Sequence, residues 1–247
     1  MAFPKLRNKH LAESLFTAKD FALYKGWKKN HFPKKMILVY QSSILRYFKR
    51  KYKGEYEKIK LSTTQQVLKR GNVGVLKIAG IGAPHAVTIL EELIMGGARE
   101  FLNIGSAGGL INKGVFLCNK AIRDEGTSHH YIADSIYSYP DEKLTKKFGK
   151  ALEKEGIKYN VGPSWTIDAP YRETKKEISY YKNKGVLTVE MESSALFAVA
   201  KLRKVKIAAV FVISDVLGDE KWNPQFHKFD FKRILNRVFD VGIKALG

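Results

Sequence analysis

The strongest constraint on the fold is a regular alternation of short apolar runs with longer amphipathic runs. Ile207–Ile213 reads IAAVFVI, a continuous apolar stretch typical of a strand buried on both faces. Apolar character predicts further strands at Met36–Tyr40, Val73–Ala79, Phe101–Ile104, Lys158–Val161 and Val186–Val189. Helical spacing predicts helices over Pro84–Gly97, Asp141–Glu155, Met191–Arg203 and Phe229–Leu246. This alternation predicts an α/β fold, a mostly parallel sheet wrapped by helices, in a single domain over residues 1–247.

The composition is that of a globular chain. Its 247 residues are 45% hydrophobic, which is enough for one sizeable core. No apolar run reaches the roughly 18–20 residues of a membrane span, and the charged start lacks the apolar segment of a signal peptide. Cys118 is the single cysteine, so no internal disulfide can form. We expect a cytoplasmic protein without a membrane partner.

The charge is strongly positive and uneven. Lys and Arg number 44 against 24 Asp and Glu, a formal charge of +20, and residues 1–80 hold 19 basic and 4 acidic residues. Such a surface could attract nucleic acid or small anions, or be only a Lys-rich solvated face. The basic residues are spread along the segment and accompany no recognised nucleic-acid module. We favour the solvated face and keep nucleic-acid binding as an alternative.

Small and acidic residues follow four of the predicted strands. These are GIGAPHA after residue 79, GSAGG after 104, EME after 189 and SD after 213. Each alone has a structural explanation, such as a tight turn, a helix cap or favourable placement in a helix dipole. Ligands of parallel sheets bind beyond the carboxyl ends of the strands. The convergence of these segments on one sheet edge predicts a small-molecule site there.

Two long segments around these strand ends resemble the signatures of the nucleoside phosphorylase superfamily. They are GIGAPHAVTILEELIMGGAREFLNIGSAGGL and VEMESSALFAVAKLRKVKIAAVFVISD, and AIRDEGTSHHY between them resembles uridine- and purine-type members. The similarity runs from about Lys77 to Asp215. It implies a three-layer fold in which a mixed, mostly parallel sheet is partly closed into a barrel and flanked by helices. It also implies a homo-oligomer, from dimer to hexamer.

The resemblance implies roles for residues at two strand ends. Glu192 matches the catalytic carboxylate that holds the ribose hydroxyls, and Met191 the residue that packs under the ribose. Glu190 belongs to the same ribose site or organises its loop. Asp215 matches the acid that protonates a leaving purine, with Ser214 beside it in the base site. Negative charge near the sugar suits this chemistry, because the transition state resembles an oxocarbenium ion.

Two further residues are candidates for the substrate site. Trp165 lies where purine-type members have an aromatic that stacks on the base, and a core tryptophan is the alternative. His10 lies near the N-terminus, where hexameric members lend a histidine to a neighbour's ribose site, and a surface histidine is the alternative. We interpret His129 and His130 as loop or subunit-contact residues, and we expect no metal site because ligand spacing is absent.

The phosphate side departs from the family pattern. Ser106 matches the hydroxyl contributor, and Gly105 opens a predicted turn whose N–H groups suit an anion. Asn103 replaces the arginine expected before Ile-Gly-Ser. Arg46, just beyond the segment that replaces the usual Gly-Asp-Pro loop, is a candidate substitute. The resemblance implies no cofactor, with inorganic phosphate as a co-substrate beside a small-molecule nucleoside.

A hydrolase is the main alternative. Asn103 and Asp215 lie in motifs that also resemble the methylthioadenosine and S-adenosylhomocysteine nucleosidases. Those enzymes activate water with an N-terminal carboxylate, and Gln41, Ser42 and Ser43 occupy that region here. Purine-type phosphorylases have an arginine where this chain has residue 217, a leucine. The AIRDEGTSHHY segment and the EMES helix favour the phosphorylase, and the preference for purine or pyrimidine stays open.

Overall fold

The computed structural model describes residues 4–28, 30–111, 113–217, 223–224 and 229–247. The helices are α1 (Ala18–Tyr24), α2 (Ser42–Lys51), α3 (Ala83–Met95), α4 (Glu142–Lys154), α5 (Lys175–Asn183), α6 (Ser193–Leu202) and α7 (Phe229–Leu246). Short 3₁₀ helices are η1 (Lys9–Leu11), η2 (Ser128–His130) and η3 (Pro170–Arg172). The strands are β1 (Lys35–Val39), β2 (Glu57–Lys60), β3 (Gln66–Arg70), β4 (Val73–Lys77), β5 (Glu100–Gly109), β6 (Val115–Asp124), β7 (Tyr137–Ser138), β8 (Asn160–Ile167), β9 (Thr188–Glu190), β10 (Lys206–Val216) and β11 (Asn223–Pro224).

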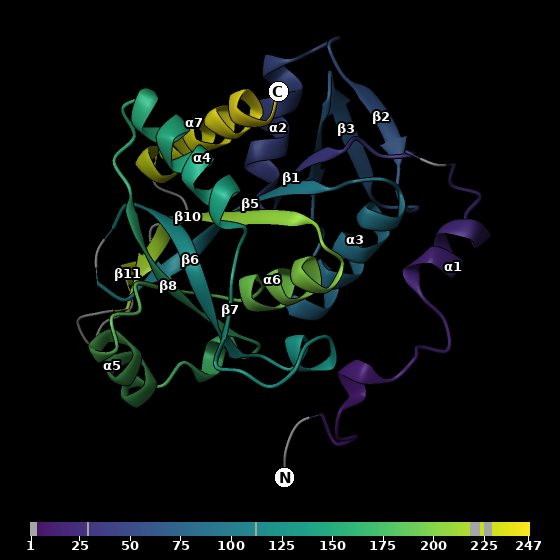
Figure 1. Ribbon diagram of the computed structural model, residues 1–247. Helices are drawn as coiled ribbons and strands as arrows, with labels where there is room; N and C mark the ends of the chain where they lie inside the picture. The colour runs from purple at the N-terminus through teal and green to yellow at the C-terminus, as the bar shows by residue number, and fades with distance from the viewer. Residues whose placement is uncertain (1–3, 29, 112, 218–222, 225–228) are drawn as a thin grey trace.

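The strands form one mixed sheet that closes on itself. Strands β10, β6, β8, β9 and β5 follow one another, and an additional pairing of β10 with β5 closes them into a barrel. The remaining strands β1, β4, β3 and β2 extend the sheet from β5 (Figure 1). Parallel pairs such as β1–β5 and β5–β10 coexist with antiparallel pairs such as β6–β10 and β5–β9. The predicted α/β class, with a mixed sheet partly closed into a barrel and flanked by helices, is confirmed.

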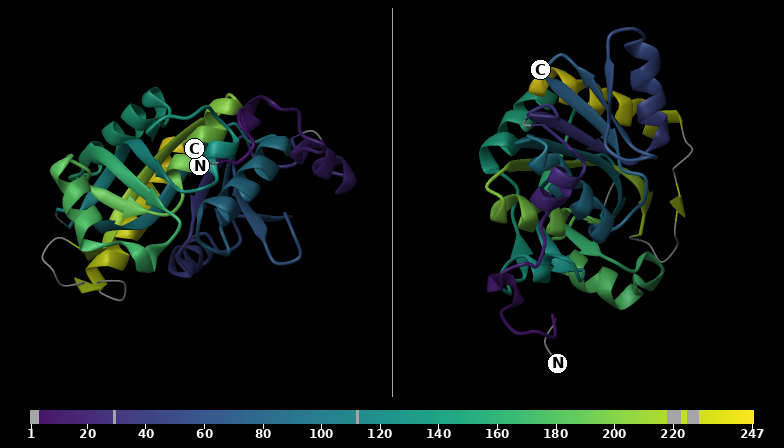
Figure 2. Two further views of the ribbon diagram at one scale, coloured as in Figure 1. Left: turned by 90° about the horizontal axis from the view of Figure 1, so that it is seen from below. Right: turned by 90° about the vertical axis from the view of Figure 1, so that its right-hand side faces the viewer.

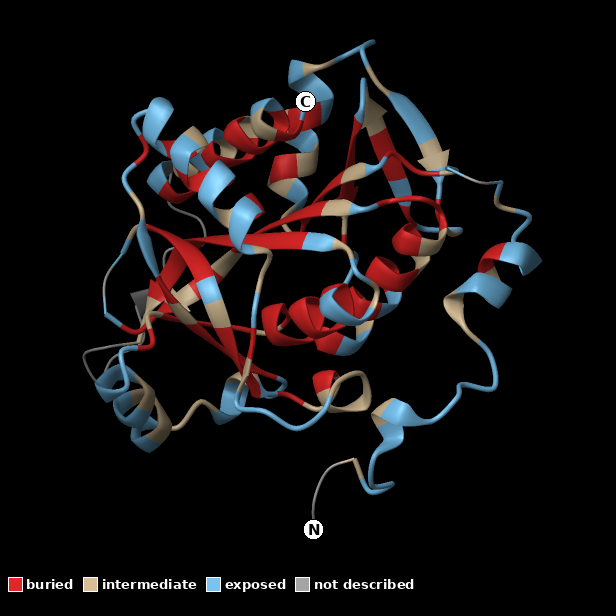
Figure 3. Ribbon diagram, in the orientation of Figure 1, coloured by how far each residue is buried: buried red, intermediate tan, exposed pale blue. Residues whose placement is uncertain are grey.

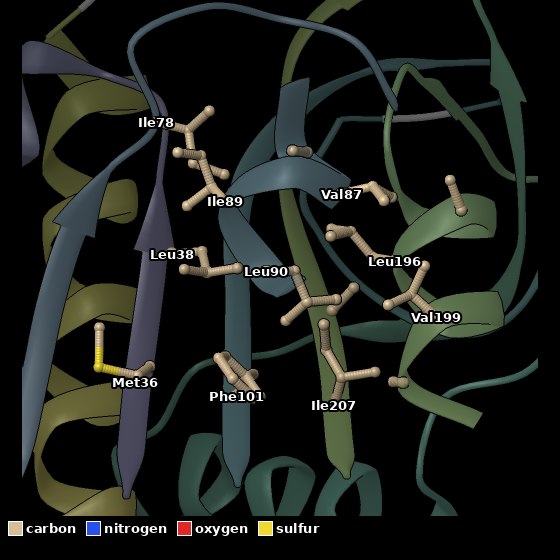
Figure 4. Close-up of a cluster of buried hydrophobic side chains, with 14 of the residues drawn as sticks. Met36, Leu38, Ile78, Val87, Ile89, Leu90, Phe101, Leu196, Val199 and Ile207 are labelled. Atoms are coloured by element: carbon tan, nitrogen blue, oxygen red, sulfur yellow. The ribbon is translucent and has the colours of Figure 1, made fainter. Parts of the chain in front are cut away.

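Helices cover both faces of the sheet. Helices α2, α4 and α7 gather on one face, and α3 and α6 lie together on the other. Strand β10 supplies both cores, with Ala208, Val210 and Val212 facing the first and Ile207, Ala209, Phe211 and Ile213 facing the second. Figure 4 shows the second core, where side chains of α3 and α6 meet those of β1, β5 and β10. The continuous apolar run is therefore explained by burial on both sides.

Two predicted strands have different limits in the structure. Strand β5 continues through Gly109, so the GSAGG segment is extended rather than a turn. Its backbone pairs with β10 along its whole length, which holds these small residues in the sheet. The strand predicted at 158–161 is β8, which begins at Asn160 and runs to Ile167. Trp165 therefore lies inside a barrel strand.

The N-terminal arm, residues 4–25, lies against the outside of the α3 and α6 layer. Its helix α1 packs on α3, and its η1 lies near η2. Figure 2 shows the arm leading away from the rest of the molecule, and Figure 3 shows that most of it is exposed. Several of its apolar side chains are open to solvent, among them Leu11, Leu15 and Phe16. Among the helices of the described residues, none is long and apolar enough to cross a bilayer.

Candidate active site

The site is built around a change of partner along one edge of β5. One edge pairs with β10 along its whole length. The other edge pairs with β1 up to Ile104 and then with β9 from Gly108 onward. Among the described strands, none pairs with residues 105–107 on that edge. The carboxyl end of β1, which is parallel to β5, lies at this point, and ligands of α/β sheets bind beyond the carboxyl ends of parallel strands.

Uncharged polar side chains line the β1 side of this opening. Tyr40 follows β1, and its ring lies over Gly105, where an added Cβ atom would meet the ring at 3.4 Å. The Tyr40 hydroxyl donates to Asn103 Oδ1 at 2.9 Å. The Gln41 Nε2 group donates to Ser106 Oγ at 2.9 Å. Ser106, predicted from the resemblance, is thus joined to Gln41, a residue to which we assigned no role.

A carboxylate closes the opposite side. Glu192 is buried, and its Oε1 accepts a hydrogen bond of 2.6 Å from the backbone N–H of Gly82, the N-cap of α3. Gly82 has φ of 96°, a conformation that favours glycine, so this residue suits the turn that aims its N–H at the carboxylate. Burial raises the pKa of Glu192 to about 8, and the nearby charge of Glu190 adds to the shift.

Glu190 holds the bend between β9 and α6 in place. Its Oε1 accepts from the Thr166 hydroxyl at 2.5 Å, and its Oε2 accepts from the backbone N–H groups of Glu192 and Ser193 at 2.9 and 2.8 Å. These bonds fix the bend that leads from β9 into α6. Burial raises the pKa of Glu190 despite these donors. All of these contacts are to the loop and its neighbours, which agrees with the organising role considered from sequence.

The charges of Glu192 and Glu190 act on Tyr40, which lies on the β1 side of the opening. The pKa of Tyr40 is raised well above its usual value by burial and then by the negative charges of Glu192 and Glu190. The Tyr40 hydroxyl therefore lies within the electrostatic field of both carboxylates. Half-buried Met191 sits between them in the chain, at the start of the bend into α6. Tyr40 links the predicted sugar residues to Asn103 and to the β5 opening.

Asp215 lies at a bulge in β10. Ile213 pairs with Ala107 and Asp215 with Gly108, so Ser214 is the extra residue. Bulges of this kind re-aim side chains and are frequent beside active sites. The Ser214 hydroxyl lies 2.8 Å from Asp215 Oδ1 and 3.3 Å from the Ala107 carbonyl oxygen. The structure thus brings Asp215 and Ser214 beside the β5 segment that carries Ser106.

An apolar wall replaces the arginine of purine-type members on this side. Leu217 packs against Gly108, where an added Cβ atom would lie 2.9 Å from Leu217 Cδ1 and 3.0 Å from Val189 Cγ1. Only glycine fits at 108 without displacing these side chains. The close packing of β5, β9 and the end of β10 therefore depends on this residue.

Three predicted residues lie away from the opening. Trp165 has 0% exposure, donates its indole N–H to Asp124 Oδ2 at 2.8 Å, and has its ring against Tyr181 with centroids 4.6 Å apart. Arg46 is exposed on α2, beyond Gln41. His10 lies in η1 of the N-terminal arm.

A cavity beside the N-terminal arm contains none of Ser106, Glu192 and Asp215. It has a volume of about 1260 Å³ and lies between the N-terminal arm, with His10, and the surface of α3, η2 and Asp168. Pro84, two residues after Gly82, lines this cavity, so the cavity lies beside the N-terminus of α3.

Sequence reasoning also missed an acidic residue beside Asp215. Glu173, between η3 and α5, has its pKa raised to about 7, first by burial and then by the charges of Asp215 and Glu177. No motif marks Glu173, because α5 is brought to the end of β10 only by tertiary packing. The Tyr40–Gln41 pair was equally hidden, although Tyr40 ends a predicted strand and Gln41 directly follows it.

Comparison with known proteins matches most of the chain to one family. The family model described as the phosphorylase superfamily matches residues 42–246, which include every strand from β2 to β11. The chain belongs to the phosphorylase superfamily. The match begins at the first residue of α2, so the superfamily region contains the Ser106, Glu192 and Asp215 elements but not the N-terminal arm.

Curated relatives match more than half of this chain in sequence, and solved structures match most of it in fold. A guanosine phosphorylase of Halorubrum lacusprofundi is 31% identical over 149 residues, 58% of this chain and 61% of the relative. A uridine phosphorylase of Treponema pallidum is 30% identical over 149 residues, 54% of this chain and 58% of the relative. The chain therefore spans about three fifths of the length of these curated relatives. An AMP nucleosidase structure from Bacteroides thetaiotaomicron superposes with a TM-score of 0.75 at 22% identity, covering 94% of this chain and 97% of that one. A uridine phosphorylase structure from Vibrio fischeri superposes with 0.73 at 25%, covering 88% and 92%.

Proposed function

We propose that this protein cleaves the N-glycosidic bond of a purine nucleoside by phosphorolysis, giving free base and ribose 1-phosphate. The observation that supports this most is the partner change along β5. Residues 105–107 of β5, which on one edge only lack a partner among the described strands, contain Ser106. They lie between the end of β1 and the Glu190–Glu192 bend after β9, and the Ser214–Asp215 bulge of β10 follows their pairing on the other edge. Relatives named guanosine phosphorylase, purine nucleoside phosphorylase and uridine phosphorylase support the reaction, and Asp215, the match to the acid of purine-type members, supports the purine preference.

The carboxylate side suits the sugar. In the proposed reaction Glu192 accepts hydrogen bonds from the ribose hydroxyls and holds negative charge near the developing cation. The Gly82 N–H holds Oε1 at 2.6 Å and the Met191 backbone N–H also donates to this carboxylate, which orients it for the sugar. Met191 packs under the ribose. Burial raises the pKa of Glu192 to about 8. Hydrogen bonds donated by the hydroxyls of a bound ribose act against this shift, because they stabilise the ionised carboxylate.

The bulge suits the leaving base. Asp215 gives a proton to the purine as the bond breaks, so that the base departs neutral. Ser214, 2.8 Å from Asp215 Oδ1, positions this carboxyl group. Trp165, which donates to Asp124, supports the wall of the barrel behind the base.

The β1 side suits the nucleophile. Helix α2 begins directly after Gln41, and the first N–H groups of a helix have no partner within it. They and the Ser106 hydroxyl, with the Gly105 backbone, are donors for phosphate. Arg46 lies on the same helix, and Asn103 is held by Tyr40. This donor set stands in place of the usual arginines, with phosphate as the co-substrate and no cofactor.

One assay tests the proposal. The protein is incubated with inosine, guanosine, adenosine and uridine, with and without phosphate, and the sugar product is identified. We expect base release only with phosphate, with ribose 1-phosphate as product and purines ahead of uridine. Release of no base from any nucleoside would contradict the proposal, and heat-inactivated protein is the control.

Hydrolysis is a second candidate, favoured by a specific observation. Among the described residues, no hydrogen bond or ion pair joins a lysine or arginine to Gln41, Asn103 or Ser106. A side without a bound cation suits water better than a phosphate dianion. Free ribose in phosphate-free buffer, from methylthioadenosine or another nucleoside, would identify this reaction in the same assay.

We further propose that the protein acts as a homo-oligomer. Open apolar side chains on the arm, including Leu11, Leu15 and Phe16, support this, because single chains rarely expose so many together. His10 on the same arm then lies where it can approach a neighbour's ribose site. Light scattering coupled to gel filtration should give a multiple of 28.0 kDa, and a monomer mass would contradict the proposal.

A further inference from the structure

The Gln41 side chain presents two different faces at the opening. Its Nε2 group donates to Ser106 Oγ at 2.9 Å. Its Oε1 atom is buried and has no hydrogen-bond partner among the described residues. An unmatched buried acceptor costs free energy, so a ligand that brings a donor to it gains affinity. Both residues are half-buried, in keeping with a place at the rim of the opening.

The bond from Gln41 also fixes what Ser106 can do. A serine hydroxyl has one proton to donate and can accept from other groups. Because Ser106 Oγ already accepts from Nε2, its own proton is directed away from Gln41. The pair therefore offers two donors, the Ser106 hydroxyl and the second Nε2 hydrogen of Gln41, and one unmatched acceptor, the Gln41 Oε1 atom. A tetrahedral anion that satisfies this acceptor must carry a proton on one oxygen.

We propose that Gln41 is a specificity-determining residue that distinguishes hydrogen phosphate from other anions by accepting a hydrogen bond from its P–OH group. This deepens the proposed phosphorolysis and rests on it. The Ser106 hydroxyl donates to an unprotonated phosphate oxygen, and Gln41 Oε1 accepts from the P–OH group. Sulfate has nearly the same size and shape and the same charge as hydrogen phosphate, but it carries no proton near neutral pH. Arsenate carries one, as phosphate does.

The decisive comparison uses the wild-type protein. Phosphate KM and the inhibition constant of sulfate against phosphate are measured at pH 7.5 with saturating purine nucleoside. We expect sulfate to bind about tenfold or more weakly than phosphate, the effect of one unmet hydrogen bond to a charged partner, while arsenate supports base release. Sulfate binding as tight as phosphate would overturn the inference, because it would show that a donor rather than Oε1 faces the anion.

A pair of variants sharpens the test. Gln41→Met keeps the length of the side chain and removes both the N–H donors and the oxygen acceptor of the amide, and Gln66→Met, at an exposed position of β3, is the matched control. We expect Gln41→Met to raise the phosphate KM about tenfold, to bring sulfate and phosphate closer together, and to leave the nucleoside KM within about twofold. An unchanged phosphate KM in a folded Gln41→Met protein would overturn the inference.

Failure of the proposed function looks different. Base release from wild-type protein at equal rates with and without phosphate would reject phosphorolysis itself, before any variant is compared. Phosphate-dependent release without discrimination against sulfate would reject only the role of Gln41. If Gln41→Met does not fold, the wild-type comparison of sulfate with phosphate still decides the inference.

Discussion

The two sides of the β5 opening differ in charge. On the α6 side Glu190 and Glu192 are both buried, and burial raises the pKa of each. On the β1 side Asn103, Gln41 and Ser106 are uncharged and hold one another or Tyr40 by single hydrogen bonds. Changes on the charged side should alter the chemical step and its pH dependence. Changes on the neutral side should alter mainly which nucleophile binds.

The largest expected effect comes from removing the charge of the sugar side. Glu192→Gln keeps the shape and the acceptor for Gly82 but cannot become negative. We expect kcat/KM to fall about 10²–10³-fold, the usual loss when one electrostatic group is removed from a transition state. Glu142→Gln, on exposed α4, is the control. Full activity of Glu192→Gln would show that the two sides do not differ as described.

Asp215→Asn should give the next largest effect. It removes the proposed proton donor, so kcat for inosine should fall about 10²-fold. An N7-methylated purine nucleoside, whose base leaves without protonation, should lose much less. Equal losses for both substrates would mean that Asp215 holds the substrate rather than protonating the base.

The pH profile of kcat/KM should carry the signature of Glu192. Its pKa of about 8 means that the ionised form, which holds the ribose, is lost as pH falls. We expect activity to fall about tenfold per pH unit below 8 in the wild type. A pH profile in which kcat/KM falls only below the ordinary pKa of a carboxyl group would contradict this prediction.

The free energy of unfolding should change with pH in the direction opposite to the activity. A carboxyl group whose pKa is raised in the folded state makes the unfolding free energy fall as pH rises from 4.5 toward 8. Denaturant unfolding between pH 5 and 9 should show this decrease, and Glu192→Gln should reduce it. A wild-type unfolding free energy that rises over this range would contradict the burial of the ionisable group.

The smallest expected effects come from removing one hydrogen bond on each side of the β5 opening. Thr166→Val removes the hydroxyl donor to buried Glu190 and should lower the unfolding free energy by about 1–3 kcal/mol. Tyr40→Phe removes the donor to Asn103 and should cost about 1 kcal/mol, because that acceptor is a neutral amide. Thermal unfolding of both variants measures the difference, and a larger loss in Tyr40→Phe would reverse the comparison.

Much of the fold could be predicted because burial leaves a direct trace in the sequence. The run Ile207–Ile213 became the central strand β10, and the terminal helix was placed correctly at Phe229–Leu246. The hairpin β2–β3, strand β6 and helices α1, α2 and α5 were not predicted. Strand β2, read as EKIK, is largely exposed, so it carries no apolar pattern. The GSAGG segment was read as a turn, because glycines usually mark one, whereas tight packing against Leu217 and Tyr40 requires small residues there.

The site was predictable only where a motif names its residues. The resemblance pointed to Ser106, Glu192 and Asp215, which lie on β5, just after β9 and on β10 beside Gly108, respectively. It could not point to Gln41 or Glu173, because their neighbours lie far away in the chain. Trp165 was assigned to the base by position, and its burial against Tyr181 follows from the length of β8.

The gap on β5 has a consequence for how such a protein can be altered. Its length is set by where β1 stops and β9 starts, about 10 Å for three extended residues. A residue inserted within β1 would turn the side chains after it to the other face, because side chains alternate along a strand. The aperture is therefore resized only at its two ends, where β1 stops at Val39 and β9 starts at Thr188, and selection or engineering must otherwise tune substrate choice through the side chains at its rim.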